Sequence, residues 1–312
     1  MKCRLKYCLF TFITFYTAAA FPQDGDRFIA DSLKMLSAVR TVECDLLIDT
    51  VANSKEYSAR GSYQEQVLPN TAGNAFLRSM YRLEIYFSMA LSAARDADPN
   101  RMTLVCHPSE DREKNRIERY TSVEGVKTFS TIDLGKLEEK LRNAGHTAQN
   151  NTENSMVFAQ ISEVRYLGGL AGMMRQIART YEFDAPVQEI LPGEEKVPVL
   201  KLTGSIRHTL HKELLPRFGG LNKKGQYPAG YPSDIEISLG RHNDFPYKIR
   251  YLRRQAEGSD KKELLLQETF SNVKVNAAPI PVSVFDPLNV PAEVFQVKDE
   301  TENFLRSLGL PQ

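Results

Sequence analysis

Alternation of apolar and polar residues with a period of two recurs in separate segments of this chain, and this pattern restricts the fold more than any other feature. Residues 41–51 place apolar side chains on one face and mainly acidic side chains on the other. Residues 81–87 repeat the pattern. A period of two is typical of a β-strand with one buried and one solvated face. The chain is therefore expected to consist mainly of antiparallel strands.

Further strands are expected along most of the remaining sequence. They are predicted at residues 55–67, 101–106, 117–122, 180–189, 197–210, 234–239, 247–254 and 262–275. In a flat open sheet so many half-polar strands would leave long unprotected edges. We therefore predict a mostly β, α+β fold, in which a strongly curved antiparallel sheet forms a half-open barrel.

Amphipathic helices are expected where apolar residues recur at three- and four-residue spacing. One such segment is residues 26–40, and another follows the capping residue Asp133 and ends near Gly145. A further helical region is predicted from Ser162 to Ile177. These helices are expected to cover the concave face of the sheet.

The N-terminus has the organisation of a secretory signal. A short basic run precedes an uncharged apolar stretch at residues 7–17, and the small residues Ala18 to Ala20 follow. The stretch is shorter than the roughly 20 residues that cross a bilayer, so a retained membrane anchor is the weaker interpretation. Residues 1–20 are predicted to be a signal peptide. Residues 21–312 are then expected to form a single soluble domain in the periplasm or another extracytoplasmic compartment.

Charge and cysteine content restrict the partners and the redox chemistry. The chain has 40 Lys and Arg residues against 39 Asp and Glu residues, without a strongly basic segment, so nucleic acid is not expected as a partner. Cys44 and Cys106 remain after the predicted cleavage, each with an apolar neighbour on the same strand face. Two buried thiols are favoured, and a disulfide between them is the alternative.

Several short strings carry a family resemblance. They are residues 30–36 leading into Val42, Gly61-Ser62-Tyr63, Arg82-Leu83-Glu84, Gly168-Gly169-Leu170, Leu202-Thr203-Gly204, residues 245–249, residues 270–276 and Val284-Phe285-Asp286. In this order they resemble the outer-membrane lipoprotein carrier family with its LolA/LolB-like fold, as an enlarged member. The resemblance implies a half-open barrel lidded by helices, whose apolar interior accepts acyl chains or another hydrophobic group. The polar residues 146–155 and the Gly- and Pro-rich residues 218–232 depart from the small carriers.

The inward positions of the predicted strands form the candidate ligand site. The expected wall of the apolar cavity consists of Leu46, Ile48, Leu83, Ile85, Phe87 and Leu104. The expected lid is the helix at residues 167–177, with Leu170, Met173, Met174 and Ile177 as its apolar stripe. Its glycines weaken the helix and its methionines adapt to varied shapes, which favours a movable element. Ordinary core packing of the same stripe is the alternative.

Sequence motifs for catalysis or metal binding are absent. His208, His211 and Glu213 are metal-ligand residue types, but strand positions three apart face opposite ways, so a solvated strand end is favoured. Nucleophile-elbow, phosphate-loop and His-Glu-x-x-His motifs do not occur. We therefore expect no cofactor, no metal and no enzymatic activity.

The leading hypothesis is an exported binder or carrier of lipid or lipoprotein acyl chains that acts without catalysis. Envelope lipoproteins or membrane proteins are its candidate partners. The alternative is an envelope interaction or sensor module whose cavity is filled by its own side chains. A hydrolase is the third hypothesis. It is retained because catalytic residues that are distant in sequence can come together in the folded protein without forming a sequence motif.

Overall fold

The structure, a computed structural model, describes residues 25–52, 55–68, 79–87, 100–109, 115–145, 163–192, 196–289, 294 and 297–307. The predicted signal peptide, the polar residues 146–155 and Ser162 lie outside this part of the chain. No helix within the described ranges is long and apolar enough to cross a membrane.

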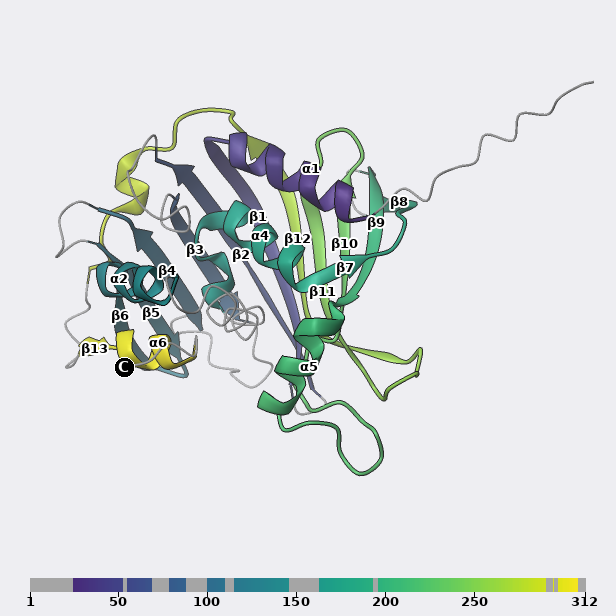
Figure 1. Ribbon diagram of the computed structural model, residues 1–312. Coiled ribbons are helices and arrows are strands. Elements are labelled where there is room, and N and C mark those ends of the chain that lie inside the picture. Colours follow the sequence, from purple (N-terminus) through teal and green to yellow (C-terminus); the bar gives the residue numbers. More distant parts are fainter. Residues whose placement is uncertain are drawn as a thin grey trace, which may run out of the picture.

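A single curved sheet dominates the fold (Figure 1). Its strands are β1 (Thr41–Ala52), β2 (Lys55–Val67), β3 (Ser79–Phe87), β4 (Arg101–His107), β5 (Arg116–Val123), β6 (Val126–Asp133), β7 (Tyr181–Phe183), β8 (Val187–Leu191), β9 (Val197–Ile206), β10 (Asp234–Gly240), β11 (Pro246–Arg254), β12 (Lys262–Val275) and β13 (Val297–Asp299). Their order is β13-β6-β5-β4-β3-β2-β1-β12-β11-β10-β9-β7, with β8 also beside β9. Only the β13–β6 pair is parallel among these pairings. The curved, unclosed sheet confirms the predicted fold class.

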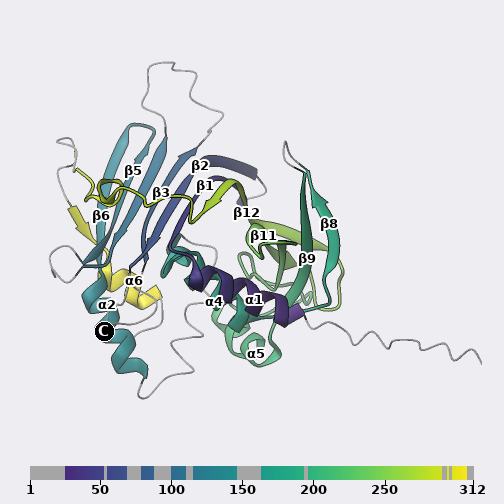
Figure 2. The same ribbon diagram turned by 90° about the horizontal axis from the view of Figure 1, so that it is seen from above.

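Helices lie on one side of the sheet (Figure 2). They are α1 (Gly25–Ala38), α2 (Leu134–Gly145), α4 (Gly169–Thr180), α5 (His208–Arg217) and α6 (Thr301–Ser307), together with the short 3-10 helix η3 (Glu163–Tyr166). A second 3-10 helix, η4 (Val282–Phe285), lies on the opposite face. The helices α1 and α4 cover the middle of the sheet, whereas α2 and α6 lie over its β5–β6 end. The Asp133 carboxylate accepts a hydrogen bond of 2.9 Å from the Lys136 N–H, which confirms the predicted cap of α2.

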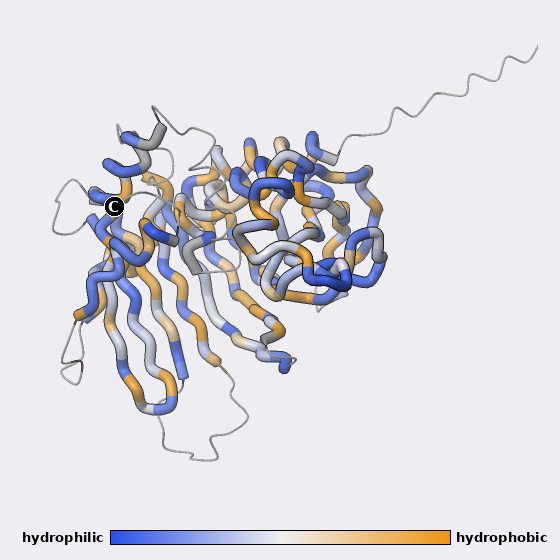
Figure 3. Tube along the Cα trace, turned by 60° about the horizontal axis from the view of Figure 1, so that its bottom comes forward, coloured by the Kyte–Doolittle hydropathy of each residue, from blue (hydrophilic) through white to orange (hydrophobic). Residues whose placement is uncertain are grey.

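Hydrophobic and hydrophilic positions alternate along the strands, as the period of two requires (Figure 3). The inward positions form one core with α1 and α4. At its centre the rings of Tyr63 and Tyr166 stack with centroids 5.1 Å apart, and both rings are fully buried. The core therefore includes phenol groups that need hydrogen-bond partners.

A segment after β12, residues 276–289, crosses the convex face of the sheet. Phe285 is 2% exposed, and Arg82 of β3 donates a hydrogen bond of 3.2 Å to the Val284 carbonyl. The Leu288 N–H donates to the buried Glu118 carboxylate of β5. This cover explains why the outward-facing Val105 of β4 is also fully buried. The chain then reaches the sheet edge as β13 and the concave face as α6.

The structure corrects several element predictions. The strand predicted at 197–210 ends at Ile206, because Leu210 and Leu214 belong to the helix α5 and Leu214 is fully buried. The strand predicted at 180–189 forms the separate strands β7 and β8. Strand β6 was not predicted, because its inward positions include the polar residues Thr128 and Ser130, which hide the alternation.

Cys44 and Cys106 are free and buried, which confirms the favoured interpretation of two thiols. Burial raises the pKa of both thiols. Neither thiol is therefore poised to act as a nucleophile.

Candidate functional site

The predicted wall residues share the concave side of the sheet. Leu83 of β3 lies opposite Leu104 of β4, and Ile85 lies opposite Met102. All predicted wall residues except Phe87 are at most 9% exposed. Phe87 ends β3 and is 36% exposed, so it lies on the same face but at the open end of the sheet.

The predicted lid residues lie within the packed core. Leu170, Met174 and Ile177 are fully buried, and Met173 is 1% exposed. They belong to the same core cluster as the wall residues Leu46 and Ile48. This half of the concave face is therefore filled by side chains of the protein itself, as the core-packing alternative requires. Movement of α4 as a lid stays a prediction.

A buried carboxylate holds the N-terminus of α4 against the sheet. Glu65 of β2 is 3% exposed and accepts hydrogen bonds of 3.0 Å from the Leu170 N–H and 2.8 Å from the Tyr63 hydroxyl. Gly169 packs against this carboxylate with a φ of +68°, and a Cβ there would lie 1.8 Å from the Glu65 Oε1. Glycine at position 169 therefore lets the backbone approach the Glu65 carboxylate closely and adopt a left-handed conformation, in addition to any effect on helix stability.

A buried ion pair fixes the turn before α4. Arg165 of η3 donates its Nε hydrogen, at 2.9 Å, to Glu268 of β12, and their side chains are 5% and 0% exposed. The Tyr166 hydroxyl donates to the same carboxylate oxygen. Burial alone would lower the pKa of Arg165, but the Glu268 charge outweighs burial and raises it. The charged pair therefore persists inside the core and ties η3 to β12.

Replacing Glu65 by Gln should change how stability depends on pH. Burial raises the pKa of Glu65, although hydrogen bonds from Leu170, Ser79 and Tyr63 oppose the shift. The folded protein then holds this proton more tightly than the unfolded chain, so its stabilising contribution is complete below the ordinary glutamate pKa and is lost as pH rises through the folded value. Urea unfolding from pH 4 upward measures the difference between wild type and Glu65→Gln. A difference that does not change with pH would contradict this account.

Truncating Met173 or Met174 to Ala should lower the free energy of unfolding by about 2 to 5 kcal/mol each, because a cavity opens in a packed core. The affinity of a hydrophobic probe per folded molecule should not change. Chemical unfolding and probe titration of the same samples measure both quantities. A small loss of stability combined with a clear loss of probe affinity would instead identify α4 as a ligand-contacting lid.

The other half of the concave face contains a cavity of about 160 Å³. Side chains from β3, β4, β5, β6 and α6 line it, namely Tyr81, Leu104, Ile117, Arg119, Ser130, Ile132, Glu300 and Phe304. The sheet residues all occupy inward positions, since Tyr81 lies level with Ile117 and Ile132, and Leu104 lies level with Arg119 and Ser130. Most of the cavity wall is therefore apolar.

Only Leu104 among the predicted site residues lines this cavity. Tyr81 lies in a predicted strand, and its alternation with polar neighbours could have identified it as inward-facing. Ile117 also lies in a predicted strand, but the inward-facing Arg119 two residues later interrupts the alternation. Phe304 had no such signal, because α6 reaches the cavity from the end of the chain.

Arg119 and Glu300 give the cavity a charged end. The Arg119 Nε donates a hydrogen bond of 3.1 Å to the Ser130 hydroxyl. Hydrogen bonds from Asn303 and Lys298 lower the pKa of Glu300, and the positive charge of Arg119 also lowers it. A ligand with a polar group could therefore be oriented in this cavity.

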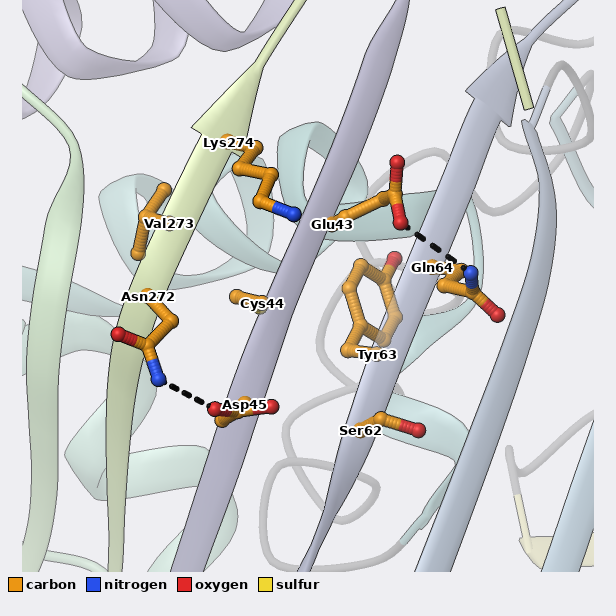
Figure 4. A pocket seen from close by; sticks show the side chains of 9 residues that line it. All are labelled: Glu43, Cys44, Asp45, Ser62, Tyr63, Gln64, Asn272, Val273 and Lys274. Carbon is orange, nitrogen blue, oxygen red and sulfur yellow. Dashed lines mark hydrogen bonds between the residues drawn. The ribbon is translucent and has the colours of Figure 1, made fainter. Parts of the chain in front are cut away.

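A hollow of different character lies on the convex face (Figure 4). It has a volume of about 590 Å³ and forms where a bulge at Asn272 interrupts the pairing of β1 with β12. Its polar groups bond to one another, with Asn272 donating to Asp45 at 2.6 Å and Gln64 donating to Glu43 at 3.4 Å. This hollow does not suit a hydrophobic ligand.

The histidines near residue 210 lie on a helix, so the predicted solvated strand end is wrong. His208 and His211 belong to the first turn of α5, and the His211 ring lies 2.8 Å from the Tyr231 hydroxyl. Within the described ranges no group of His, Cys, Asp or Glu side chains could hold a metal ion.

Comparisons with known proteins give structural similarity alone. No family model matches the sequence, and no curated protein matches it. A DUF1329 family protein from Desulfovibrio piger has 8% identity and a TM-score of 0.35, over 84% of this chain and 95% of that one. A putative outer membrane lipoprotein-sorting protein domain from Vibrio parahaemolyticus has 8% identity and a TM-score of 0.32, over 84% and 96%. A LolA superfamily protein from Nitrosomonas europaea has 9% identity and a TM-score of 0.28, over 85% and 98%.

The lipoprotein-sorting and LolA names correspond to the family that the sequence strings resemble. Identities and TM-scores this low do not transfer a function to the chain. Its function has to be inferred from its own residues.

Proposed function

We propose that the protein is an extracytoplasmic binder or carrier of lipid or lipoprotein acyl chains, and that the ligand's apolar end enters the cavity between β3–β6 and α6. The cavity itself supports this function, because it is a hollow of about 160 Å³ with mainly apolar walls on the concave face. Small-molecule sites commonly combine apolar walls with a few convergent polar groups, as Arg119 and Ser130 provide here. No catalytic step forms part of the proposal.

The volume limits which part of a ligand the cavity can hold. About 160 Å³ is close to the size of an apolar cavity that accommodates one benzene ring. A short alkyl segment of about five methylenes would contribute about 4 kcal/mol at about 0.8 kcal/mol per methylene. That contribution alone corresponds to only millimolar affinity. A tighter ligand must therefore also contact exposed apolar groups beyond the cavity, such as Phe87 at the end of β3.

Two further features of the proposal come from the sequence. The signal-like N-terminus supports a location in the periplasm or another extracytoplasmic compartment. The cargo class follows from the resemblance to the lipoprotein carriers, with envelope lipoproteins or membrane proteins as candidate partners. The single domain proposed for residues 21–312 is consistent with one continuous sheet that includes the first and last described strands.

Native mass spectrometry of protein purified without detergent tests the binding function. A carrier should retain a bound lipid, and denaturation should release it. Titration with a fluorescent fatty acid should then give saturable binding after the lipid has been removed. Protein that carries no lipid and does not bind the probe would contradict the proposal.

A second function, the interaction or sensor module with a self-filled cavity, is favoured by the half of the concave face beneath α4. There the buried Arg165–Glu268 ion pair and the buried methionines fill the space between α4 and the sheet. This function predicts no retained lipid and no saturable probe binding, so the same measurements distinguish the two functions.

A further inference from the structure

Exposed apolar side chains gather at one end of the sheet. At this end β1, β3 and β5 finish and β2, β4 and β6 begin, and we call these strand ends the rim. The pairings establish the arrangement, because Phe87 lies opposite Ala59, and Tyr86 lies opposite Arg101. The β5–β6 hairpin closes the series with Val123 opposite Val126.

The exposed side chains of the rim lie mainly on the concave face. The exposed fractions are 40% for Tyr57, 36% for Phe87, 37% for Val123 and 65% for Val126. By the alternation along each strand, all of them point to the same side as Leu83 and Leu104. Only Tyr86, which is 43% exposed, points to the convex side.

The rim continues into the apolar wall of the proposed site. Phe87, Ile85 and Leu83 follow one another at every second position of β3, and their exposed fractions fall from 36% to 4% to 0%. Leu104, directly opposite Leu83, lines the cavity. The inward positions of β3 therefore carry no charge between the exposed Phe87 and the buried Leu83, which packs beside the cavity residue Leu104.

We propose that the rim docks on the surface of a lipid bilayer. The docking surface goes beyond the proposed binding function, and the two can fail separately.

The chemistry of the rim fits a bilayer better than a protein partner. Its apolar groups stand at strand ends, and Val123 and Val126 flank the β5–β6 hairpin turn at residues 124–125. Tyrosine rings favour the headgroup region, where the ring is apolar and the hydroxyl is hydrated. Lys55 and Arg101 are the first residues of β2 and β4, Lys127 is the second residue of β6, and these cations lie at the same end of the sheet to meet lipid phosphates.

Acidic residues limit the electrostatic part of the attraction. Glu56 and Glu124 lie beside these basic residues at the strand ends. The net positive charge of the rim is therefore small, and binding should depend mainly on apolar insertion. Raising the salt concentration should consequently weaken docking only slightly.

Edge strand β8 supplies a matched control. Ile190 is 66% exposed, close to the 65% of Val126, but β8 lies beside β9 at the opposite side of the sheet. Substitutions at positions 126 and 190 therefore alter side chains of equal solvent exposure, one on the rim and one away from it. Cys44 and Cys106 are buried and should not react with a thiol reagent in the folded protein.

An environment-sensitive fluorophore at position 126 tests the docking surface. Val126→Cys and Ile190→Cys are made in the full chain with Cys3 and Cys8 replaced by Ser, labelled, and mixed with vesicles of phosphatidylethanolamine and phosphatidylglycerol. The emission at position 126 should shift to the blue and rise several-fold, also at high salt, whereas position 190 should not respond. In vesicle sedimentation Val126→Glu should weaken binding about tenfold, with Ile190→Glu unchanged.

An equal response at both positions, no response at position 126, or complete loss of docking at high salt would overturn the docking surface. Fatty-acid binding in vesicle-free solution is measured on Val126→Glu in parallel and should match wild type. If the wild type does not bind the fatty acid but position 126 still responds to vesicles, the binding function fails and the docking surface stands.

Discussion

Replacing Arg165 by Met is expected to lower the free energy of unfolding by about 3 to 5 kcal/mol, because the substitution leaves the carboxylate of Glu268 buried without its charged partner. Both side chains are at most 5% exposed, so water cannot replace the lost interaction. Urea unfolding followed by circular dichroism measures the change.

Removing both charges should cost much less than removing one. The double variant Arg165→Met with Glu268→Leu should recover most of the lost stability, apart from the cost of the Tyr166 hydroxyl that loses its acceptor. Arg253→Met is a control at a more exposed ion pair with Glu263 and should cost about 1 kcal/mol or less. If Arg165→Met is no more damaging than Arg253→Met, the buried pair does not hold η3 on the sheet.

Replacing Leu104 by Trp is expected to weaken fatty-acid binding by more than tenfold while the protein remains folded. The larger side chain would occupy much of the cavity of about 160 Å³ that Leu104 lines. Because the larger ring would extend into this cavity and would not displace packed side chains, the substitution should cost less stability than the roughly 1 to 3 kcal/mol typical of overpacking a filled core. Probe titration and thermal unfolding measure the two effects.

Leu83→Trp is the matched comparison for this variant. Leu83 lies directly opposite Leu104, but it is fully buried and does not line the cavity. Its replacement should therefore destabilise the protein more. Leu104→Met, which nearly conserves volume, should retain both stability and binding. Unchanged probe affinity in folded Leu104→Trp would show that the ligand does not enter the cavity.

Strands of the sheet could be predicted from the sequence where their inward-facing side chains are apolar. In β1 and β3 the alternation defined both the strand and its buried side, and the structure confirms both. The pattern failed in β6, because Thr128 and Ser130 face inward. It also failed at residues 207–210, where a short apolar pattern fits a strand or a helix equally and the burial of Leu214 decides for the helix.

The site was less predictable than the fold. Alternation identifies which side chains face inward, but it does not show where inward side chains leave space. That depends on contacts between distant segments. Met173 and Met174 fill the hollow beneath α4, whereas Phe304 reaches the other half from the end of the chain and leaves a cavity beside Leu104. The segment at 276–289, which directs the chain toward α6, has no periodic pattern that would place it on the convex face.

Photo-crosslinking with a fatty acid that carries a diazirine near the end of its chain tests most directly where the ligand binds. The label is activated on the folded complex, and the modified peptides are identified by mass spectrometry. We expect modification of β4, β5, β6 and α6, the elements that contain Leu104, Ile117, Ile132 and Phe304, and loss of this modification in Leu104→Trp. Modification confined to α4, or labelling that Leu104→Trp leaves unchanged, would contradict this expectation.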